Sequence, residues 1–372
     1  MTANAQPFPA EDQLWRKVVR ALDNRLLKLT IMPTEKCNFR CTYCYEDFAR
    51  GLMPPKVVGG LKRLLTARSP DLRVLDLRWF GGEPMLGLPV VREISRHAQA
   101  LEKRFPELTY VASMTTNGFL LTPDRFQELL ELGVRRYQIS LDGYRDKHDR
   151  TRRRIDGGGT FDTIWSNLLA ARSCAQDFSI MLRVHFSPYT LEQVEELIQE
   201  INREFGADPR FRIFFKAITR LGGPNNDRIP RTSTAWQEKV KRRLAKLVRG
   251  HTDVVDPAGD CYICYAAEPN SLVVRSDGQL ARCTVAFDDP RNQVGYLKPD
   301  GTLELDLERS RLWFAGLETL DREVLHCPLP KLAKLDPPLV QLYPEHPANG
   351  SPEKGRRRAV RIRSGRVAAA DR

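Results

Sequence analysis

The sequence lacks the long apolar segments of an integral membrane protein. No run reaches about 18 consecutive apolar residues, the length that suggests a membrane-spanning helix. Residues 1–23 carry charges throughout, so they have no apolar core of a secretory signal. We therefore expect a protein of the cytoplasm with no membrane partner.

Internal repeats are also absent, and histidine is scarce, with six in 372 residues. A hydrophobic fraction of 41% and a charged fraction of 28% are ordinary for globular proteins and exclude a fibrous or wholly disordered chain. At about 150 residues per domain, the length suggests two or three domains.

Positive charge is concentrated near the C-terminus. Residues 351–372 contain eight Lys or Arg against two acidic residues, which gives +6 of the net +12. We interpret residues 336–372 as a disordered, solvated tail. The alternative is a segment that contacts an acidic peptide or a nucleic acid.

Short β-rich runs alternate with amphipathic helical patterns from residue 26 to residue 216. Such repeated units indicate parallel strands joined by right-handed crossovers, and six of them predict an α/β fold, an open, partial (β/α)6 barrel. Residues 1–25 would form a helical extension, residues 217–250 a linking region, and residues 251–335 a small C-terminal domain built on a β-hairpin. The six predicted strands are Leu26–Met32, Arg73–Trp79, Leu108–Met114, Arg136–Leu141, Ser179–His185 and Phe211–Phe215.

Seven of the eight cysteines fall into two groups. The first group, Cys37, Cys41 and Cys44, follows the first predicted strand, where ligands of such sheets bind. Three thiolates without a histidine cannot alone complete a four-coordinate zinc site. They can ligate three irons of a [4Fe–4S] cluster and leave the fourth iron open for a small molecule. The alternative is a zinc site completed by a distant residue.

This cysteine spacing, CxxxCxxC, resembles the signature of the radical SAM superfamily, and the resemblance extends over residues 26–330. It implies that Cys37, Cys41 and Cys44 hold a catalytic [4Fe–4S] cluster whose open iron chelates S-adenosylmethionine (SAM). Tyr43 falls where the family places an aromatic residue beside the adenine. The resemblance further implies reductive cleavage of SAM to a 5′-deoxyadenosyl radical, driven by an electron donor such as flavodoxin or ferredoxin.

Further residues at the ends of the predicted strands match this family. Gly81 and Gly82 let the backbone approach a ligand closely. The resemblance implies that Glu83 contacts the ammonium group of the methionine part of SAM. By resemblance to the family, Ser140 would contact the ribose or the carboxylate of SAM. Arg183 would bind the methionine carboxylate. The alternative for Arg183 is a surface salt bridge. The predicted cofactor-binding set is Tyr43, Gly81, Gly82, Glu83, Pro84, Thr116, Asn117, Ser140, Asp142 and Arg183.

The second group, Cys261, Cys264, Cys283 and Cys327, could ligate a second metal centre. An Asp-Gly turn predicts a hairpin between Cys264 and Cys283 that brings these cysteines together. By spacing alone, zinc and iron–sulfur are equally suitable. The region resembles the SPASM or twitch extension of radical SAM enzymes, but it has fewer cysteines than full SPASM. The resemblance thus implies one auxiliary [4Fe–4S] cluster.

Family members with such an extension mostly modify ribosomally made peptides or proteins by crosslinking, oxidation or epimerisation. We therefore expect a peptide or protein substrate, with an acidic leader suited to a basic chain. Only about 25 residues precede the first predicted strand, so a leader-binding module would be a separate protein. The alternatives are dehydrogenation of a small molecule in natural-product biosynthesis, and a zinc-bound basic nucleic-acid-binding protein. The basic tail lacks interleaved aromatic residues, which argues against the last.

Overall fold

A computed structural model describes residues 10–250 and 262–333. Cys261 and the predicted tail, residues 336–372, lie outside these ranges. A single ten-stranded sheet runs through the described chain in the order β10-β9-β8-β7-β1-β2-β3-β4-β5-β6. Its strands are β1 (Leu26–Ile31), β2 (Val74–Trp79), β3 (Thr109–Thr116), β4 (Val134–Leu141), β5 (Ser179–Phe186), β6 (Phe211–Ala217), β7 (Ser271–Val274), β8 (Gln279–Ala281), β9 (Gln293–Leu297) and β10 (Leu303–Leu305).

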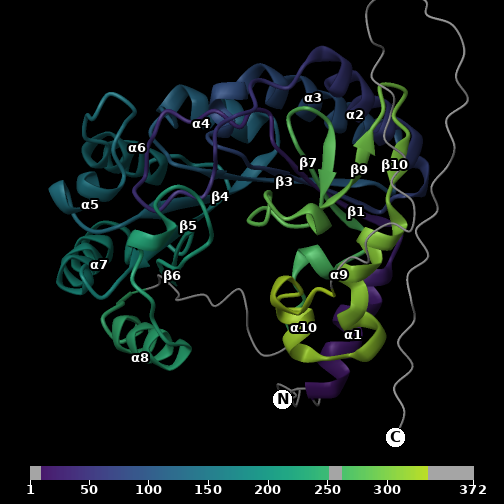
Figure 1. The fold of residues 1–372 in the computed structure, drawn as a ribbon. Coiled ribbons are helices and arrows are strands. Elements are labelled where there is room, and N and C mark those ends of the chain that lie inside the picture. The colour runs from purple at the N-terminus through teal and green to yellow at the C-terminus, as the bar shows by residue number, and fades with distance from the viewer. Residues whose placement is uncertain (1–9, 251–261, 334–372) are drawn as a thin grey trace, which may run out of the picture. The chain divides into compact units, whose positions relative to one another are not determined.

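Strands β1 to β6 are parallel neighbours in sequence order, which confirms the partial (β/α)6 barrel. Helices alternate with these strands and lie along the outside of the curved sheet (Figure 1). The helices of the described chain are α1 (Ala10–Leu22), α2 (Pro55–Arg68), α3 (Leu88–Arg104), α4 (Pro123–Glu131), α5 (Asp146–Thr151), α6 (Phe161–Arg172), α7 (Leu191–Phe205), α8 (Thr234–Ala245), α9 (Leu307–Thr319) and α10 (Arg322–His326).

The barrel core forms on one apolar face of the central strands. Leu29 and Ile31 of β1 and Leu75 and Leu77 of β2 lie at alternate positions and are fully buried, whereas the positions between them hold polar residues such as Thr30 and Asp76. Parallel pairing brings the carboxyl ends of six strands to one edge. The loops that carry the first cysteine group and the other predicted SAM-binding residues therefore meet at that edge.

The C-terminal strands continue the barrel sheet. Strand β7 pairs in parallel with β1, with Ser271 opposite Lys28, and β8, β9 and β10 follow as antiparallel strands. The predicted hairpin is confirmed as β7 and β8, and Gly278 at its turn has φ of +91°. The division into five domains stays a prediction, because the proposed boundary at residue 251 lies outside the described residues.

A buried ion pair joins the C-terminal strands to the loop after β1. The guanidinium of Arg275, just after β7, donates to both carboxylate oxygens of Glu35 over 3.1 and 2.5 Å. Arg275 also lies over the ring of Phe287, 4.1 Å from its centroid. Since Glu35 is two residues before Cys37, this pair connects the first cysteine loop with the C-terminal extension.

The N-terminal helix belongs structurally to the C-terminal region. Leu14 and Val18 of α1 form a small apolar cluster with Ile263 and with Leu325 of α10. At the other end of the sheet, Trp236 of α8 packs against Phe186, with 5.9 Å between the ring centroids. Within residues 10–250 and 262–333, no helix has the length and apolar character needed to cross a membrane.

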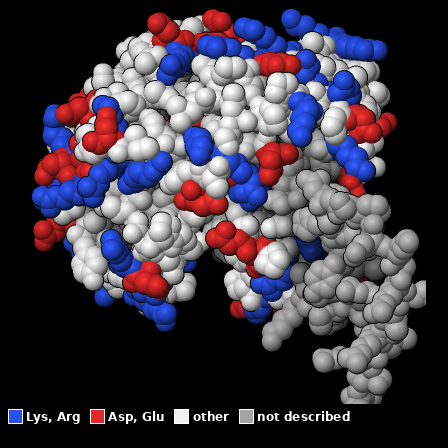
Figure 2. Space-filling model, turned by 45° about the horizontal axis from the view of Figure 1, so that its top comes forward, with Lys and Arg blue, Asp and Glu red and all other residues white. Residues whose placement is uncertain are grey.

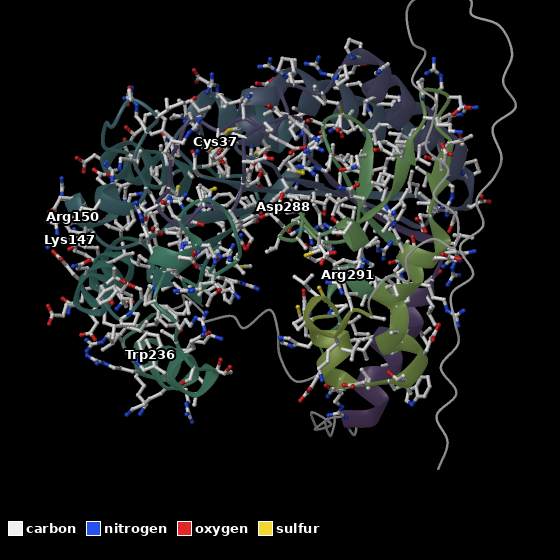
Figure 3. The ribbon with its side chains drawn as sticks, in the orientation of Figure 1. Cys37, Lys147, Arg150, Trp236, Asp288 and Arg291 are labelled. Atoms are coloured by element: carbon white, nitrogen blue, oxygen red, sulfur yellow. The ribbon has the colours of Figure 1, made fainter. Side chains whose placement is uncertain are left out.

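The surface of the barrel is strongly charged, whereas the first cysteine loop is internal. Figure 3 shows Lys147 and Arg150 of α5 at the outer edge of the barrel, and Cys37 farther in. The functional residues must therefore be sought where the strand-end loops converge.

Candidate active site

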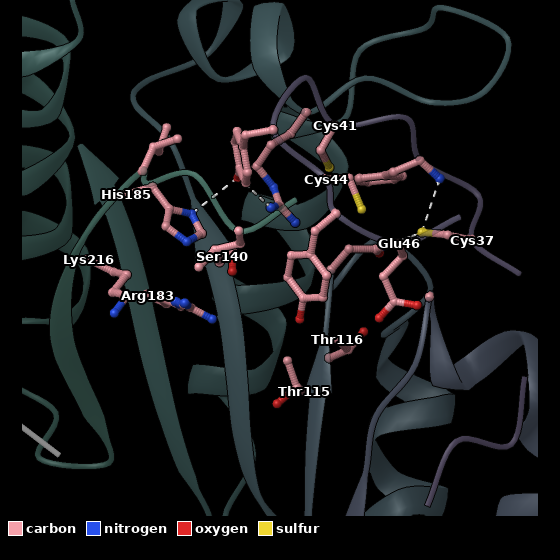
Figure 4. Close-up of a pocket in the computed structure, with 18 of the residues that line it drawn as sticks. Cys37, Cys41, Cys44, Glu46, Thr115, Thr116, Ser140, Arg183, His185 and Lys216 are labelled. Carbon is pink, nitrogen blue, oxygen red and sulfur yellow. Dashed lines mark hydrogen bonds between the residues drawn. The ribbon is translucent and has the colours of Figure 1, made fainter. Parts of the chain in front are cut away.

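A cavity lies at the carboxyl edge of the sheet, with a volume of about 960 Å³ that includes its open mouth. Residues at the carboxyl ends of the six barrel strands, or on the loops that follow them, line it. Figure 4 shows the three cysteines on one side of this cavity and Arg183, His185 and Lys216 on the other. Of the predicted residues, those that line the cavity are Cys37, Cys41, Tyr43, Cys44, Gly81, Gly82, Thr116, Asn117, Ser140 and Arg183.

The three cysteines of the first loop are free thiols that face the same cavity. Burial raises the pKa of each thiol, for Cys44 to about 12. Buried thiols of this kind become thiolates only when a positive partner compensates the charge. Metal ions supply that charge and displace the protons. The set of three thiols around one hollow therefore fits the three protein ligands of a [4Fe–4S] cluster with one open iron.

Two glycines allow the loop after β2 to pack on the cysteine loop. Gly81 has φ of +124°, and a Cβ there would lie 2.3 Å from the carbonyl oxygen of Thr34. A Cβ on Gly82 would lie 2.5 Å from the carbonyl oxygen of Lys36. Both positions thus need glycine, and both leave bare backbone on the cavity wall.

Glu83 does not line the cavity, although it was predicted to contact SAM. Its fully buried carboxylate accepts hydrogen bonds from the Thr116 hydroxyl at 2.9 Å, the Asn117 amide at 2.8 Å and the Met85 amide at 3.0 Å. The carboxylate thereby joins the loops after β2 and β3. Pro84 likewise lies buried outside the cavity lining, at the start of a short 3-10 helix. Contact between Glu83 and an ammonium group stays a prediction.

Tyr43 is fixed by a buried network behind the cysteine loop. Its hydroxyl donates to the Asp142 carboxylate at 2.9 Å and accepts from the Arg152 guanidinium at 2.9 Å. The His185 ring lies 3.0 Å from the same Asp142 oxygen. Burial disfavours the charged form of Asp142, but the hydrogen bond from His185 and the nearby positive charges hold its pKa below the usual value. Asp142 therefore acts here as an anionic anchor that orients Tyr43.

His148 lies on the other side of Asp142. The backbone N–H of Asp142 donates to Nδ1 of His148 at 3.3 Å, and the ring packs against Phe161. Burial lowers the pKa of His148 to about 4, so the ring is neutral near pH 7. Through these contacts His148 packs under the turn that follows β4 and holds it in place.

Arg183 is the cavity residue best suited to bind an anion. It lies on β5 beside Ser140 of β4, and its Nε atom is buried without a hydrogen-bond partner in the described structure. Burial lowers the pKa of its guanidinium. A buried N–H group without a partner is costly, and a carboxylate bound by the guanidinium would satisfy it. This feature fits the methionine carboxylate of SAM.

Sequence reasoning missed several residues of the cavity wall. His185 lies two positions after Arg183, on the same face of β5, and Lys216 of β6 is opposite His185 in the strand register. The alternation of side chains along a strand was the signal that could have identified both. Glu46 also lines the cavity, and burial together with the charge of Glu35 raises its pKa to about 8. Arg152, which also lines the cavity, was not among the predicted site residues.

Three of the four cysteines in the second group are near enough to interact electrostatically, but the described residues contain no group of three Cys, His, Asp or Glu arranged to hold a metal ion. The charges of Cys283 and Cys327 help to raise the pKa of the Cys264 thiol to about 12, after the larger effect of burial. The amide of Cys264 donates to the Leu325 carbonyl at 2.8 Å, which holds this loop against α10. The fourth predicted ligand, Cys261, lies outside the described residues.

Comparisons with known proteins identify the barrel. Residues 31–201 match the family model of the radical SAM superfamily. The chain is 33% identical over 150 residues to a GTP 3′,8-cyclase of Mycolicibacterium smegmatis, covering 40% of this chain and 38% of that protein. It is 29% identical over 178 residues to a GTP 3′,8-cyclase of Clostridium perfringens, covering 47% and 50%. The chain thus spans half or less of the length of these curated relatives.

Solved structures share the fold over more of the chain. A structure described as native anSMEcpe with bound AdoMet has a TM-score of 0.59 at 17% identity, covering 76% of this chain and 80% of that one. Streptococcus suis SuiB bound to precursor peptide SuiA has a TM-score of 0.58 at 13% identity, covering 88% and 78%. Together with the three free thiols after β1, these findings show that residues 31–201 form a domain of the radical SAM superfamily, which implies S-adenosylmethionine and a [4Fe–4S] cluster as cofactors.

Proposed function

We propose that this enzyme uses SAM-derived radical chemistry to modify a ribosomally made peptide or protein by crosslinking, oxidation or epimerisation. The observation that carries the radical chemistry is that three free, partly buried thiols line the same cavity as Arg183, whose Nε atom has no hydrogen-bond partner in the described structure. When bound, the cluster and SAM supply a 5′-deoxyadenosyl radical that abstracts hydrogen from the substrate.

The protein residues of the cavity position these groups. Cys37, Cys41 and Cys44 would hold the cluster, and Arg183 would bind the methionine carboxylate of SAM. The bare backbone of Gly81 and Gly82 leaves room for the methionine part. Asp142 and Arg152 keep the Tyr43 ring in one orientation, which restricts where the adenine can lie.

Similarity of fold supports a peptide or protein substrate. SuiB is a structure with a bound precursor peptide, and its match covers 88% of this chain, far beyond the family domain at residues 31–201. We propose that the C-terminal extension holds one auxiliary [4Fe–4S] cluster through Cys264, Cys283 and Cys327 with Cys261. Such a cluster could accept the electron released by substrate oxidation. A flavodoxin or ferredoxin would supply the electron that reduces the first cluster. A separate protein would bind the acidic leader of the peptide substrate.

A small-molecule substrate is the second candidate. The observation that favours it is the name shared by the curated relatives, GTP 3′,8-cyclase. Those matches cover half or less of each relative, so the part of those proteins that determines the substrate need not be shared.

Anoxic reconstitution tests the proposal. We expect about eight irons and eight sulfides per chain, the content of two cubane clusters, and 5′-deoxyadenosine after reduction with dithionite in the presence of SAM. Replacing Cys37, Cys41 and Cys44 with alanine should halve the iron and abolish 5′-deoxyadenosine. Mass spectrometry of peptides encoded beside the gene should then show loss of hydrogen or a changed stereocentre. Conversion of GTP with no change in any such peptide would favour the second candidate.

A further inference from the structure

A basic groove lies next to the active-site cavity. It has a volume of about 1520 Å³ including its open mouth, and is formed by the loops after β1, β4, β5 and β6. We call it the arginine groove, after Arg40, Arg153, Arg154 and Arg228, which line it together with one carboxylate, Asp156.

The arginine groove adjoins the active-site cavity. Tyr43 and Ile218 line both spaces, so a peptide in the groove would lie next to the cavity that the first cysteine group lines. Loops that follow β1, β4, β5 and β6 all contribute to its lining, so a peptide segment in the groove would contact several of them.

Little of the positive charge in the groove is neutralised by protein. The guanidinium of Arg40 donates to the backbone carbonyls of Cys37 at 3.0 Å and Phe39 at 2.7 Å, and not to a carboxylate. Arg154 forms an ion pair with Asp156. Neither Arg153 nor Arg228 has an ion pair with any residue of the described chain. The lining as a whole thus carries a clear positive excess.

This excess differs from the mixed charge of the molecular face drawn in Figure 2. Figure 2 shows lysines and arginines interspersed with acidic residues over the face that it draws. A cleft lined by one sign of charge attracts ligands of the opposite sign more strongly than a mixed surface does.

The wall that carries the arginines is held in place by backbone hydrogen bonds. The amide of Arg40 donates to the carbonyl of Arg153 at 2.9 Å, and the amide of Ile155 donates to the carbonyl of Asn38 at 2.9 Å. Along this segment Arg152 points inward to Tyr43, whereas its neighbour Arg153 is exposed. A preformed wall loses little entropy when a ligand binds.

Apolar side chains in the groove distinguish among acidic polymers. Ile155 is 63% exposed and Tyr189 is 78% exposed, and both line the groove. A single-stranded nucleic acid would need a series of exposed rings for its bases, but Tyr189 is the one exposed aromatic side chain in the described lining. Aliphatic and aromatic contacts beside arginines suit a peptide that has both apolar and acidic residues.

We propose that the arginine groove binds an acidic segment of the peptide or protein substrate and leads the neighbouring residue into the active-site cavity. This inference rests on the proposed peptide-modifying function and adds the place and the charge of the bound segment. Glutamate or aspartate side chains pair with Arg153 and Arg228, and apolar side chains pack on Ile155 and Tyr189.

Binding measurements on the anoxically reconstituted full chain test this proposal. The probe is a short fluorescein-labelled peptide that alternates glutamate with leucine and glycine, and its control has glutamine in place of glutamate. Fluorescence anisotropy should give a dissociation constant at least about tenfold lower for the glutamate peptide, and added salt should reduce the difference.

Charge reversal locates the binding site. The double variant Arg153→Glu with Arg228→Glu should weaken binding of the glutamate peptide by about tenfold or more. The matched control, Arg96→Glu with Arg104→Glu, changes the charge equally at exposed positions of α3 and should change binding by less than about twofold. Because both variants keep the basic C-terminal residues, their difference reports on the groove alone.

Three results would overturn the proposal. The first is equal weakening of glutamate-peptide binding in both double variants, and the second is no weakening in the groove variant. The third is that an oligothymidylate or GTP binds more tightly than the glutamate peptide and loses that binding in the groove variant. The groove variant should still form 5′-deoxyadenosine from SAM without peptide. Loss of that product in the wild type would contradict the proposed function instead, so the two failures can be told apart.

Discussion

The buried ion pair between Glu35 and Arg275 gives the sharpest stability prediction. Glu35 is 1% exposed and Arg275 is 4% exposed, and two hydrogen bonds join them. Replacing Arg275 with alanine leaves the Glu35 charge buried without its main partner. Removal of one partner of a buried pair costs about 3–5 kcal/mol.

The expected change in melting temperature follows from the size of the chain. Unfolding entropy of about 2.1 cal/mol/K per residue, over roughly 300 described residues, gives about 0.6 kcal/mol per degree. Arg275→Ala should therefore lower Tm by about 5–8 °C, as measured by differential scanning calorimetry under anoxic conditions. The exposed pair of Arg311 with Glu318 provides the control, and Arg311→Ala should cost at most about 1 kcal/mol.

A second substitution tests the cause of the loss. If the cost comes from an uncompensated charge, adding Glu35→Gln to Arg275→Ala should recover part of the lost Tm, because the amide is easier to bury. The reasoning is refuted if Arg275→Ala behaves like Arg311→Ala. It is also refuted if the double variant is less stable than Arg275→Ala alone.

Three further predictions concern pH, backbone and SAM. Since the pKa of His148 is about 4 when folded and near 6.5 when unfolded, its contribution to the unfolding free energy should be constant above pH ~6.5 and fall by up to about 3 kcal/mol toward pH 4. Chemical denaturation of His148→Asn should show a shallower fall. Gly81→Ala should destabilise by about 3 kcal/mol or more and reduce cluster loading, because its φ and the Thr34 carbonyl exclude a Cβ. Arg183→Met should weaken SAM binding about tenfold to a hundredfold without lowering Tm.

Each of these has a matched control or contrary result. If the unfolding free energy falls equally with pH in the wild type and in His148→Asn, then His148 is not the group that titrates. Gly51→Ala, where no atom lies within 4 Å of an added Cβ, should leave Tm and iron content near wild type. Arg183→Lys should retain part of the SAM affinity, and unchanged affinity in Arg183→Met would contradict the carboxylate contact.

Local patterns predicted the barrel well. Each of the six predicted strands overlaps a strand of the structure. Strand–helix alternation is a property of residues near one another in sequence, and parallel pairing then places the loops at one edge. This is why Cys37, Cys41, Cys44, Ser140 and Arg183 could be assigned to one cavity from sequence.

The sequence by itself determined the cysteine spacing, the glycines and the strand-end positions, because each is encoded within a few neighbouring residues. Only the tertiary structure decided that β7 lies beside β1, that Arg275 pairs with Glu35, and that Glu83 turns away from the cavity to join two loops. Residues 28 and 271 become neighbours only when the sheet forms, and no local pattern specifies such a pairing. The arginine groove has the same origin, since its side chains come from loops far apart in the chain and share one wall only after folding.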